Sequence, residues 1–427
     1  MNDGYMKADK NIFERKPKKT ILLVIMVLAL ILDVSITKIV TFYKEQAKEQ
    51  AKEQARKGVA RITTKHEVYH HTFKKNSVTE ASFRDRKYYV YTNSLGFKDK
   101  SSRTIPISSN KKRIVFIGDS FTEGVSLNYE DTFVGMIDVE LKGKGIEVLN
   151  AGRSSYGALI YWRKIKYLIE DVGLKFGELV VFGDLADGYN DIFWYQLTKD
   201  GNVTHLDSLY LGHWNERDPR HTLARAVLPK LKYQIKGNST LLYHFLEMIN
   251  YFDAQIEEIE RQERIGQGKE KEIQDKEKKR QEKEKKRSMG RWDTVITSKV
   301  ASWTVDENLY KEWGQKGVER EIAYMDMLLK LLRSNNIKLT VAVFPWPTQV
   351  WYEDLDSIQV RVWEEWCLNN DVKFVNYFPD FVRKGLSDEE KIRVLEKYYL
   401  PWDVHFNKQG NRLITRKFLS EYFQNNQ

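Results

Sequence analysis

The sequence is poor in cysteine, and Cys367 is its only one. A single cysteine excludes an intramolecular disulfide and any cysteine-built metal site, and none lies near the N-terminus to carry a lipid. Zinc-finger spacing and helix-turn-helix patterns are also missing, so the formal net charge of +10 does not lead us to expect nucleic-acid binding. The histidines lack the Asp or Glu spacing of a zinc site. We predict no metal and no cofactor.

The N-terminus carries an apolar run, Ile21–Leu32, which continues past two charged residues to Tyr43. The unbroken run is short for a membrane span, which needs about 20 residues, but residues 20–43 together reach that length. No small-residue cleavage site follows the run, which favours an uncleaved anchor over a cleaved signal peptide. Basic residues cluster in the tail 1–19, and such tails stay cytoplasmic. We expect a single-pass membrane protein whose remaining chain is periplasmic or extracellular.

Two further segments are dominated by charged residues. Residues 44–58 repeat Lys-Glu-Gln-Ala, whose helix-forming residues and opposite charges three apart predict a helical stalk. Residues 255–287 form a Glu/Lys/Arg/Gln series with no apolar stripe after Ile265, which predicts a solvated helical arm. A coiled-coil arm that docks a protein partner is the alternative. The arm lies in an insertion at about 192–306, which could also act as a lid.

From residue 84 to 427, short apolar runs alternate with helical patterns, which is typical of a parallel α/β sheet. The predicted strands are 113–117, 146–150, 179–182, 339–344 and 373–376. The predicted helices are 132–141, 158–169, 317–332, 360–368 and 410–423. Ser120, Gly152 and Asn190 follow three of the strands. Because such sheets bind ligands at the carboxyl ends of their strands, we expect a catalytic domain with its site there.

Four short blocks carry the candidate chemistry, and they occur in this order: Ile117-Gly-Asp-Ser-Phe-Thr-Glu-Gly124, Val148-Leu-Asn-Ala-Gly-Arg153, Gly188-Tyr-Asn-Asp191 and Pro401-Trp-Asp-Val-His-Phe-Asn407. Each block alone could be an ordinary turn. Together they offer a serine, a histidine that could take its proton, an acid to orient the imidazole, and donors for a developing oxyanion. That combination indicates acyl transfer through a serine nucleophile.

The four blocks together resemble the SGNH (GDSL-like) hydrolase superfamily. Thr92-Asn-Ser-Leu-Gly-Phe97 is similar to the segment that precedes the nucleophile in its membrane-anchored bacterial members. The resemblance implies a three-layer α/β/α fold with a mostly parallel, flavodoxin-like sheet. It also implies Ser120 as nucleophile and His405 as general base. The oxyanion donors would be the N–H groups of Ser120 and Gly152 and the amide of Asn190.

The last block departs from the superfamily's usual Asp-x-x-His, because Asp403 lies only two residues before His405. Residues i and i+2 of an extended segment point to the same side, so Asp403 could still orient the His405 ring. If it does not, a backbone carbonyl would take that role. The spacing around Ser120 is not the Gly-x-Ser-x-Gly elbow of α/β-hydrolases, which argues against that fold.

Three residues are candidate substrate contacts. Arg153, beside Gly152, could clamp an anionic or polar group. Trp346 and Thr348 follow a predicted strand and should border the crevice, although packing in its wall is the simpler role for Trp346. Three other tryptophans could stack on sugar rings or serve only in packing: Trp194, Trp214 and Trp402.

These observations favour an anchored ester hydrolase that forms an acyl-Ser120 intermediate. Acylated, in particular acetylated, surface carbohydrate is the expected substrate, and another small-molecule ester is the alternative. Two other functions stay open. An O-acyltransferase would pass the acyl group to a cell-surface polysaccharide instead of water. A non-catalytic glycan-binding or scaffold protein would keep the fold without the chemistry.

Overall fold

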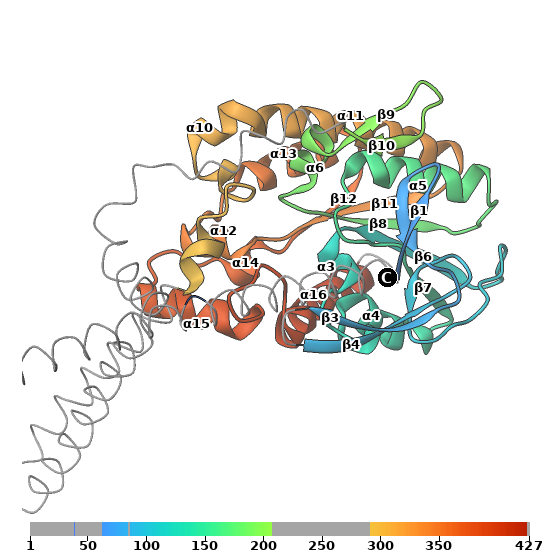
Figure 1. Ribbon diagram of the computed structural model, residues 1–427, viewed down its shortest axis with the longest axis horizontal. Helices are drawn as coiled ribbons and strands as arrows, with labels where there is room; N and C mark the ends of the chain where they lie inside the picture. Colours follow the sequence, from blue (N-terminus) through green and yellow to red (C-terminus); the bar gives the residue numbers. More distant parts are fainter. Residues whose placement is uncertain (1–37, 39–61, 84–85, 207–290, 425–427) are drawn as a thin grey trace, which may run out of the picture. The chain divides into compact units, whose positions relative to one another are not determined.

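The computed structural model describes residue 38 and the ranges 62–83, 86–206 and 291–424 (Figure 1). Apart from Lys38, these residues belong to one compact unit of the chain. The predicted basic tail, stalk and charged arm lie outside the described residues, as does the predicted anchor except for Lys38, so these four stay predictions. Within the ranges described, no helix is both long enough and apolar enough to cross a membrane.

The described unit is built on a sheet of eight strands in the order β12-β11-β8-β6-β7-β5-β4-β3. The first five run parallel: β12 (Lys373–Asn376), β11 (Lys338–Val343), β8 (Glu178–Gly183), β6 (Lys112–Gly118) and β7 (Ile146–Asn150). They agree with the five predicted strands to within one residue at either end. Every residue of β8 is buried, and so is all of β6 after its first residue. Strands covered on both faces are continuous apolar runs, which made them visible in the sequence.

The other end of the sheet is antiparallel, and its strands are β5 (Lys98–Asp99), β4 (Arg86–Thr92) and β3 (Val78–Phe83). A hairpin of β1 (Thr63–His66) and β2 (His70–Phe73) precedes them. Phe73 and Ile62 share a buried cluster with residues of β3 and β4. The domain start predicted at residue 84 is therefore wrong, because residues 62–83 contribute both core and sheet. The predicted mostly parallel sheet is confirmed, with this antiparallel addition.

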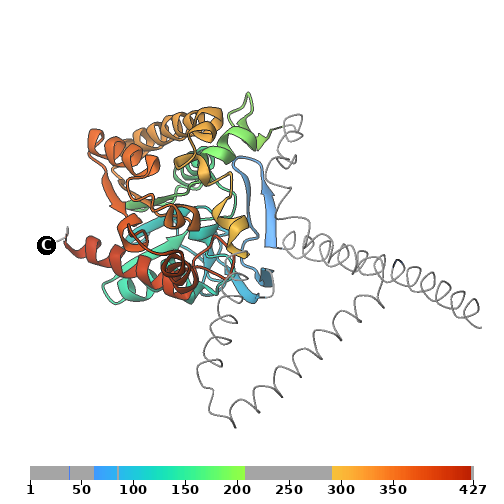
Figure 2. The same ribbon diagram turned by 90° about the vertical axis from the view of Figure 1, so that its left-hand side faces the viewer.

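Helices cover both faces of the sheet (Figures 1 and 2). One layer holds α5 (Ala158–Glu170), α11 (Gln315–Ser334) and α13 (Ile358–Asn369). The other holds α4 (Phe133–Lys142), α15 (Asp388–Tyr398) and α16 (Lys408–Gln424). Five of the six were predicted to within two residues at either end, and α15 was not. The three-layer α/β/α arrangement is confirmed.

Short elements join these layers: α3 (Ser120–Glu123), η1 (Tyr129–Asp131), α6 (Asp187–Phe193), α10 (Glu307–Leu309), η4 (Tyr310–Gly314), α12 (Pro347–Trp351) and α14 (Phe378–Phe381). Of the predicted insertion, residues 207–290 lie outside the described ranges. Its first end forms a hairpin of β9 (Tyr195–Leu197) and β10 (Val203–His205), and its second end contains η3 (Ser302–Thr304). Trp303 in η3 is buried and donates its indole N–H to the carbonyl of Leu185 at 3.0 Å, so this end of the insertion packs into the unit.

Candidate active site

Ser120 lies on a tight turn at the carboxyl end of β6. The strand ends at Gly118, Asp119 caps the following one-turn helix α3, and the helix ends at Gly124 with φ +72°. The Oδ1 atom of Asp119 accepts the N–H of Phe121 at 2.9 Å. A β-carbon at Gly118 would stand 2.2 Å from the hydroxyl of Thr122, so the turn needs glycine at this position. The geometry holds the Ser120 hydroxyl at the edge of the sheet where parallel folds bind ligands.

Ser120, His405 and Asp403 form a continuous hydrogen-bonded chain. The Nε2 atom of His405 lies 2.8 Å from Ser120 Oγ, and its Nδ1 atom lies 2.5 Å from Asp403 Oδ1. The same Asp403 oxygen accepts the main-chain N–H of His405 at 3.0 Å. An imidazole that donates from Nδ1 to a carboxylate has Nε2 free to accept the serine proton. The structure thus brings together the three residues that were predicted for the catalytic chain.

The short Asp-x-His spacing works for a reason that differs from the sequence argument. The segment before His405 is a turn and not an extended strand, and Trp402 within it has φ +56°. The loop is closed by the Leu400 N–H, which donates to the His405 carbonyl at 2.8 Å. Asp403 reaches the ring by bonding the backbone two residues ahead, as aspartate often does in turns. One residue fewer than the usual spacing is therefore compatible with the contact.

Asp119 is a second carboxyl group at the nucleophile, and the sequence reasoning missed it. Its Oδ2 atom lies 3.0 Å from Ser120 Oγ, so it competes with His405 for the single hydroxyl proton. Burial raises the pKa of Asp119, against the opposing effects of the Phe121 N–H and the nearby His405. The only sequence signal for this role was its place directly before Ser120.

The predicted oxyanion donors are only partly brought to one place. Asn190, on α6, lines the same cavity as Ser120 and uses one amide hydrogen to hold the Tyr156 carbonyl at 3.1 Å. Among the residues that the structure describes, none accepts its second amide hydrogen, which can therefore donate to a ligand. Gly152, in contrast, is not among the cavity-lining residues. Its N–H donates to Asn150 Oδ1 at 3.0 Å, and a β-carbon there would meet Thr122 at 2.7 Å. Gly152 is thus a close-packing position beneath α3.

Ser155, and not Gly152, brings a main-chain N–H to the cavity that contains Ser120. It lines the cavity, and its backbone is left-handed with φ +66°. Its N–H makes no hydrogen bond to any residue that the structure describes. A left-handed backbone usually marks glycine, and a serine at this position gave no signal in the sequence.

The cavity around Ser120 has a volume of about 540 Å³. Aromatic side chains form much of its wall: Phe83, Tyr88, Tyr189, Trp194 and Trp346. Of the three predicted substrate contacts, Arg153 and Trp346 line this cavity. The Trp346 indole N–H is directed to Asp184 Oδ2 at 2.8 Å, so the ring serves as a wall. Thr348 is fully buried, bonds the Val295 carbonyl at 3.3 Å, and does not reach the cavity.

Buried carboxyl groups support the loop and helix that carry Asn190. Asp184 receives the Trp346 indole, and Asp187 receives the Tyr161 hydroxyl at 2.9 Å. Asp191 accepts the N–H of Leu159 in the first turn of α5. Burial raises the pKa of all three acids, that of Asp191 to about 7, against the opposing effect of the Leu159 N–H. Their hydrogen bonds hold together the segments that lie behind the cavity wall.

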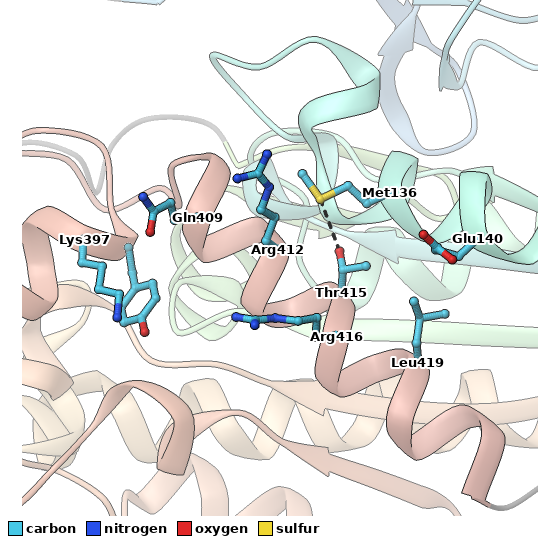
Figure 3. Close-up of a pocket in the computed structure, with 9 residues that line it drawn as sticks. Met136, Glu140, Lys397, Gln409, Arg412, Thr415, Arg416 and Leu419 are labelled. Carbon is cyan, nitrogen blue, oxygen red and sulfur yellow. Dashed lines mark hydrogen bonds between the residues drawn. The ribbon is translucent and has the colours of Figure 1, made fainter.

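A second cavity, of about 500 Å³, lies between α4, α15 and α16 (Figure 3). Thr415 on α16 contacts Met136 on α4 at its base, and the side chains around it include Lys397, Arg412 and Arg416. It contains neither Ser120 nor a histidine. The nucleophile chemistry therefore belongs to the cavity around Ser120.

Three histidines gather beside the cavity without the arrangement of a metal site. The Nδ1 atoms of His70 and His71 are 2.8 Å apart, and the His205 ring lies 5.6 Å from that of His70. Burial lowers the pKa of His71 to about 3 and that of His70 as well. Across the part of the chain that the structure describes, no group of three histidines, cysteines or acids could hold a metal ion.

No family model matches the sequence, and a comparison with curated proteins found no match. Solved structures do match, and three of them are described below. A putative acylhydrolase from Bacteroides fragilis is 11% identical, with 74% of this chain and 89% of that chain covered and a TM-score of 0.33. A GDSL-like lipase from Bacteroides thetaiotaomicron is 12% identical, with 75% and 92% covered and a TM-score of 0.34. An acetyl xylan esterase is 13% identical, with 72% of this chain and 98% of that chain covered and a TM-score of 0.35.

One of these structures is described as GDSL-like, which is the superfamily that the four sequence blocks resemble. The α/β/α architecture stands on the strand order and helix layers, and the site stands on the contacts around Ser120.

Proposed function

We propose that this chain is a serine-dependent ester hydrolase that works through an acyl-Ser120 intermediate. One observation carries the proposal, namely the chain of hydrogen bonds from Asp403 through His405 to Ser120. The serine and the histidine are 285 positions apart in the sequence, so only the fold brings them within 2.8 Å. A nucleophile, a base and an orienting acid in this order are what acyl transfer at serine requires.

The steps follow from the positions of the groups. Ser120 Oγ attacks the ester carbonyl carbon while its proton passes to His405 Nε2, and Asp403 stabilises the imidazolium. The new alkoxide takes hydrogen bonds from Asn190 Nδ2 and from main-chain N–H groups, for which Ser155 and Ser120 are the candidates. Each such donor typically lowers the barrier by about 3 kcal/mol.

The tetrahedral intermediate then collapses. The bond from carbon to the alcohol oxygen breaks, and the alcohol leaves with the proton held on His405. Water attacks the acyl-Ser120 carbonyl while His405 takes one of its protons. The carboxylic acid is released, and the proton on His405 returns to Ser120 Oγ. Every proton moves through the same imidazole, so no further acid or base is needed.

We propose acylated, in particular acetylated, carbohydrate outside the cytoplasm as the substrate. Support comes from the aromatic side chains that line the cavity, among them Tyr88, Trp194 and Phe83, since aromatic rings can pack against sugar rings. Location outside the cytoplasm rests on the predicted anchor at 20–43 and its basic tail.

The purified full-length chain tests the ester hydrolase with p-nitrophenyl acetate, with and without an added glycan acceptor. We expect p-nitrophenol release that Ser120→Ala abolishes and that Ser334→Ala, on the exposed end of α11, leaves unchanged. Retained turnover in Ser120→Ala would contradict the proposal. Release of free acetate identifies a hydrolase, whereas an acetylated glycan product identifies an acyltransferase that uses the same serine.

A further inference from the structure

The active-site cavity contains one cation of fixed charge. Among the residues that the structure describes, Arg153 is the only lysine or arginine in its lining. Asp119 and Glu123 are the carboxylic acids of the lining, and His71 and His405 are its histidines. Whether this cavity attracts or rejects an anionic substrate therefore depends on what the Arg153 guanidinium already binds.

Both terminal nitrogens of Arg153 are bound by the protein. Its Nη1 forms an ion pair with Glu123 Oε2, and its Nη2 donates to Thr63 Oγ1 at 2.6 Å. The guanidinium carbon lies 4.4 Å from the ring centre of Phe73, and the residue is only 5% exposed. The buried Nε alone finds no hydrogen-bond partner among the described residues. The cation is held in place and cannot swing towards a ligand without breaking these contacts.

Glu123 is built to stay ionised beside that cation. It is 1% exposed and also accepts the main-chain N–H of Ser154 at 2.7 Å and its hydroxyl at 2.5 Å. Burial raises the pKa of this carboxyl, but Arg153, Lys98 and the Ser154 hydrogen bonds more than offset it and hold the pKa below its ordinary value. Lys98 does not line the cavity, since its ammonium group bonds two main-chain carbonyls. The positive charge of Arg153 in the cavity lining is therefore neutralised by the carboxylate of Glu123.

An anionic acyl group would enter this cavity at a cost. It would lose its water and find an arginine already paired, with aromatic rings around it. An uncharged acyl group would have no such charge to desolvate and could pack against the aromatic side chains of the lining. The acyl group is the part of the substrate that becomes bonded to Ser120 Oγ, and Glu123 lies on the same helical turn as Ser120. The ion pair therefore involves the helical turn that carries the acylated serine.

We infer that Glu123 is a specificity-determining residue that restricts the enzyme to esters of uncharged acyl groups by neutralising Arg153 within the cavity. This inference rests on the proposed ester hydrolase. Without Glu123 the same guanidinium would be a ready partner for a carboxylate, because arginine binds carboxylates in a bidentate fashion. The preference for uncharged acyl groups is therefore expected to weaken when Glu123 is replaced and Arg153 keeps its charge.

The test compares two esters with four-carbon acyl groups, p-nitrophenyl butyrate and p-nitrophenyl succinate, on the full-length chain. We expect wild-type kcat/KM to favour butyrate by at least about 100-fold, which corresponds to two tenfold steps of about 1.4 kcal/mol each. Glu123→Gln should narrow this ratio by at least about tenfold. The double variant Glu123→Gln with Arg153→Gln, which removes both charges, should restore the wild-type preference. An unchanged ratio in folded Glu123→Gln would overturn the inference.

A second comparison needs no variant. The p-nitrophenyl ester of monomethyl succinate has a longer acyl chain without the charge, and we expect the wild type to turn it over at a rate near that of butyrate. If the methyl ester is as slow as the free succinate, chain length and not charge decides, and the inference is wrong. Equal turnover of butyrate and succinate also overturns it but leaves the ester hydrolase standing. Failure of every ester would instead remove the proposed function.

Discussion

The parallel strands and the N-terminal edge of the sheet (residues 62–99) supply different parts of the candidate site. Ser120 follows β6, Ser155 follows β7, and Asn190 follows β8. None of the predicted catalytic groups comes from the N-terminal edge. That edge nevertheless lines the cavity with six residues: Ile62, Thr63, His71, Ser82, Phe83 and Tyr88. Reacting groups and much of the substrate wall therefore come from separate regions.

This division has a physical reason. A central parallel strand is fixed by a neighbour on each side and by helices on both faces, so the turn that follows it holds a reacting atom in one place. The N-terminal edge has fewer constraints, because β3 pairs on one side only and the β1–β2 hairpin forms a separate sheet. We therefore expect substitutions after the parallel strands to lower kcat and substitutions in the edge to raise KM.

The largest effect should come from replacing the general base, His405. A loop near the C-terminus places this residue next to Ser120 at the end of β6. His405→Ala should lower kcat by roughly 10⁴- to 10⁶-fold, since the members of such a unit fail together. The matched control is His205→Ala, because His205 is exposed and, within the described ranges, its ring bonds only the Trp194 carbonyl and contacts the rings of His70 and Tyr195. Steady-state kinetics with p-nitrophenyl acetate measures both. Comparable losses in the two variants would show that His405 has no special role.

Two carboxyl groups near Ser120 can be separated by matched variants. Asp403→Asn should lower kcat by roughly 10²- to 10⁴-fold, because the imidazole loses the partner that fixes its tautomer. Asp119→Asn keeps an oxygen for the Phe121 N–H, so we expect a loss of about tenfold or less. Thermal melting of both variants controls for folding. If Asp119→Asn proves the more damaging, the orienting acid has been assigned to the wrong residue.

The sequence was informative where burial is two-sided and less so where it is one-sided. Strands such as β8 are continuous apolar runs, whereas β3 has Ala81 as its one fully buried residue and carries Thr79, Glu80 and Ser82. A segment of this kind resembles a loop when taken alone, which is why the domain start was placed too late. The positions of Ser120, Asn190 and His405 were predictable because each lies in a motif next to a strand or helix that the sequence marks clearly.

The parts of the site that escaped prediction depend on tertiary contacts. The pairing of Arg153 with Glu123 joins segments that are 30 positions apart, and no sequence spacing marks it. Ser155 takes a left-handed backbone that serine seldom adopts, so the neighbouring Gly152 was assigned as the oxyanion donor. Thr348 was expected at the cavity because it follows a strand. Its helix α12 instead turns the hydroxyl towards the Val295 carbonyl.

The oxyanion donor after β8 should give the next effect in size. Asn190→Ala removes the amide of a cavity-lining residue and should lower kcat by roughly 10²- to 10³-fold with little change in KM. A KM effect without a kcat effect would mean that Asn190 binds the ground state only. That outcome would break the assignment of reacting groups to the parallel strands.

A milder effect is expected from the N-terminal edge. Thr63→Val keeps the side-chain shape but removes the hydroxyl that accepts from Arg153 Nη2. We expect KM to rise a few-fold through a loosened wall, while kcat stays within about threefold of wild type. Kinetics with an acetylated oligosaccharide checks this better than a small ester, because the larger substrate touches more of the wall. A loss confined to kcat would contradict the proposed division of roles.

The smallest expected effect is a change in stability with pH, and it comes from Asp191. The pKa of Asp191 is about 7 in the folded chain, against 3.8 as its ordinary value. The folded state thus binds the Asp191 proton more tightly than the unfolded state does. The stabilisation that this proton gives the folded state is complete below about pH 4 and is lost as pH rises to about 7. Asp191→Asn should therefore raise Tm at pH 8 relative to wild type and change it little at pH 4. An equal shift at both pH values would contradict the raised pKa.

The central claim is that Ser120 becomes covalently acylated, and trapping the adduct tests it most directly. The full-length chain is treated with an uncharged alkyl fluorophosphonate, digested, and analysed by peptide mass spectrometry. We predict a single phosphonylated site on the peptide that contains Ser120, formed at a rate that His405→Ala reduces by orders of magnitude. An unlabelled Ser120 in a folded chain that still hydrolyses p-nitrophenyl acetate would contradict the account.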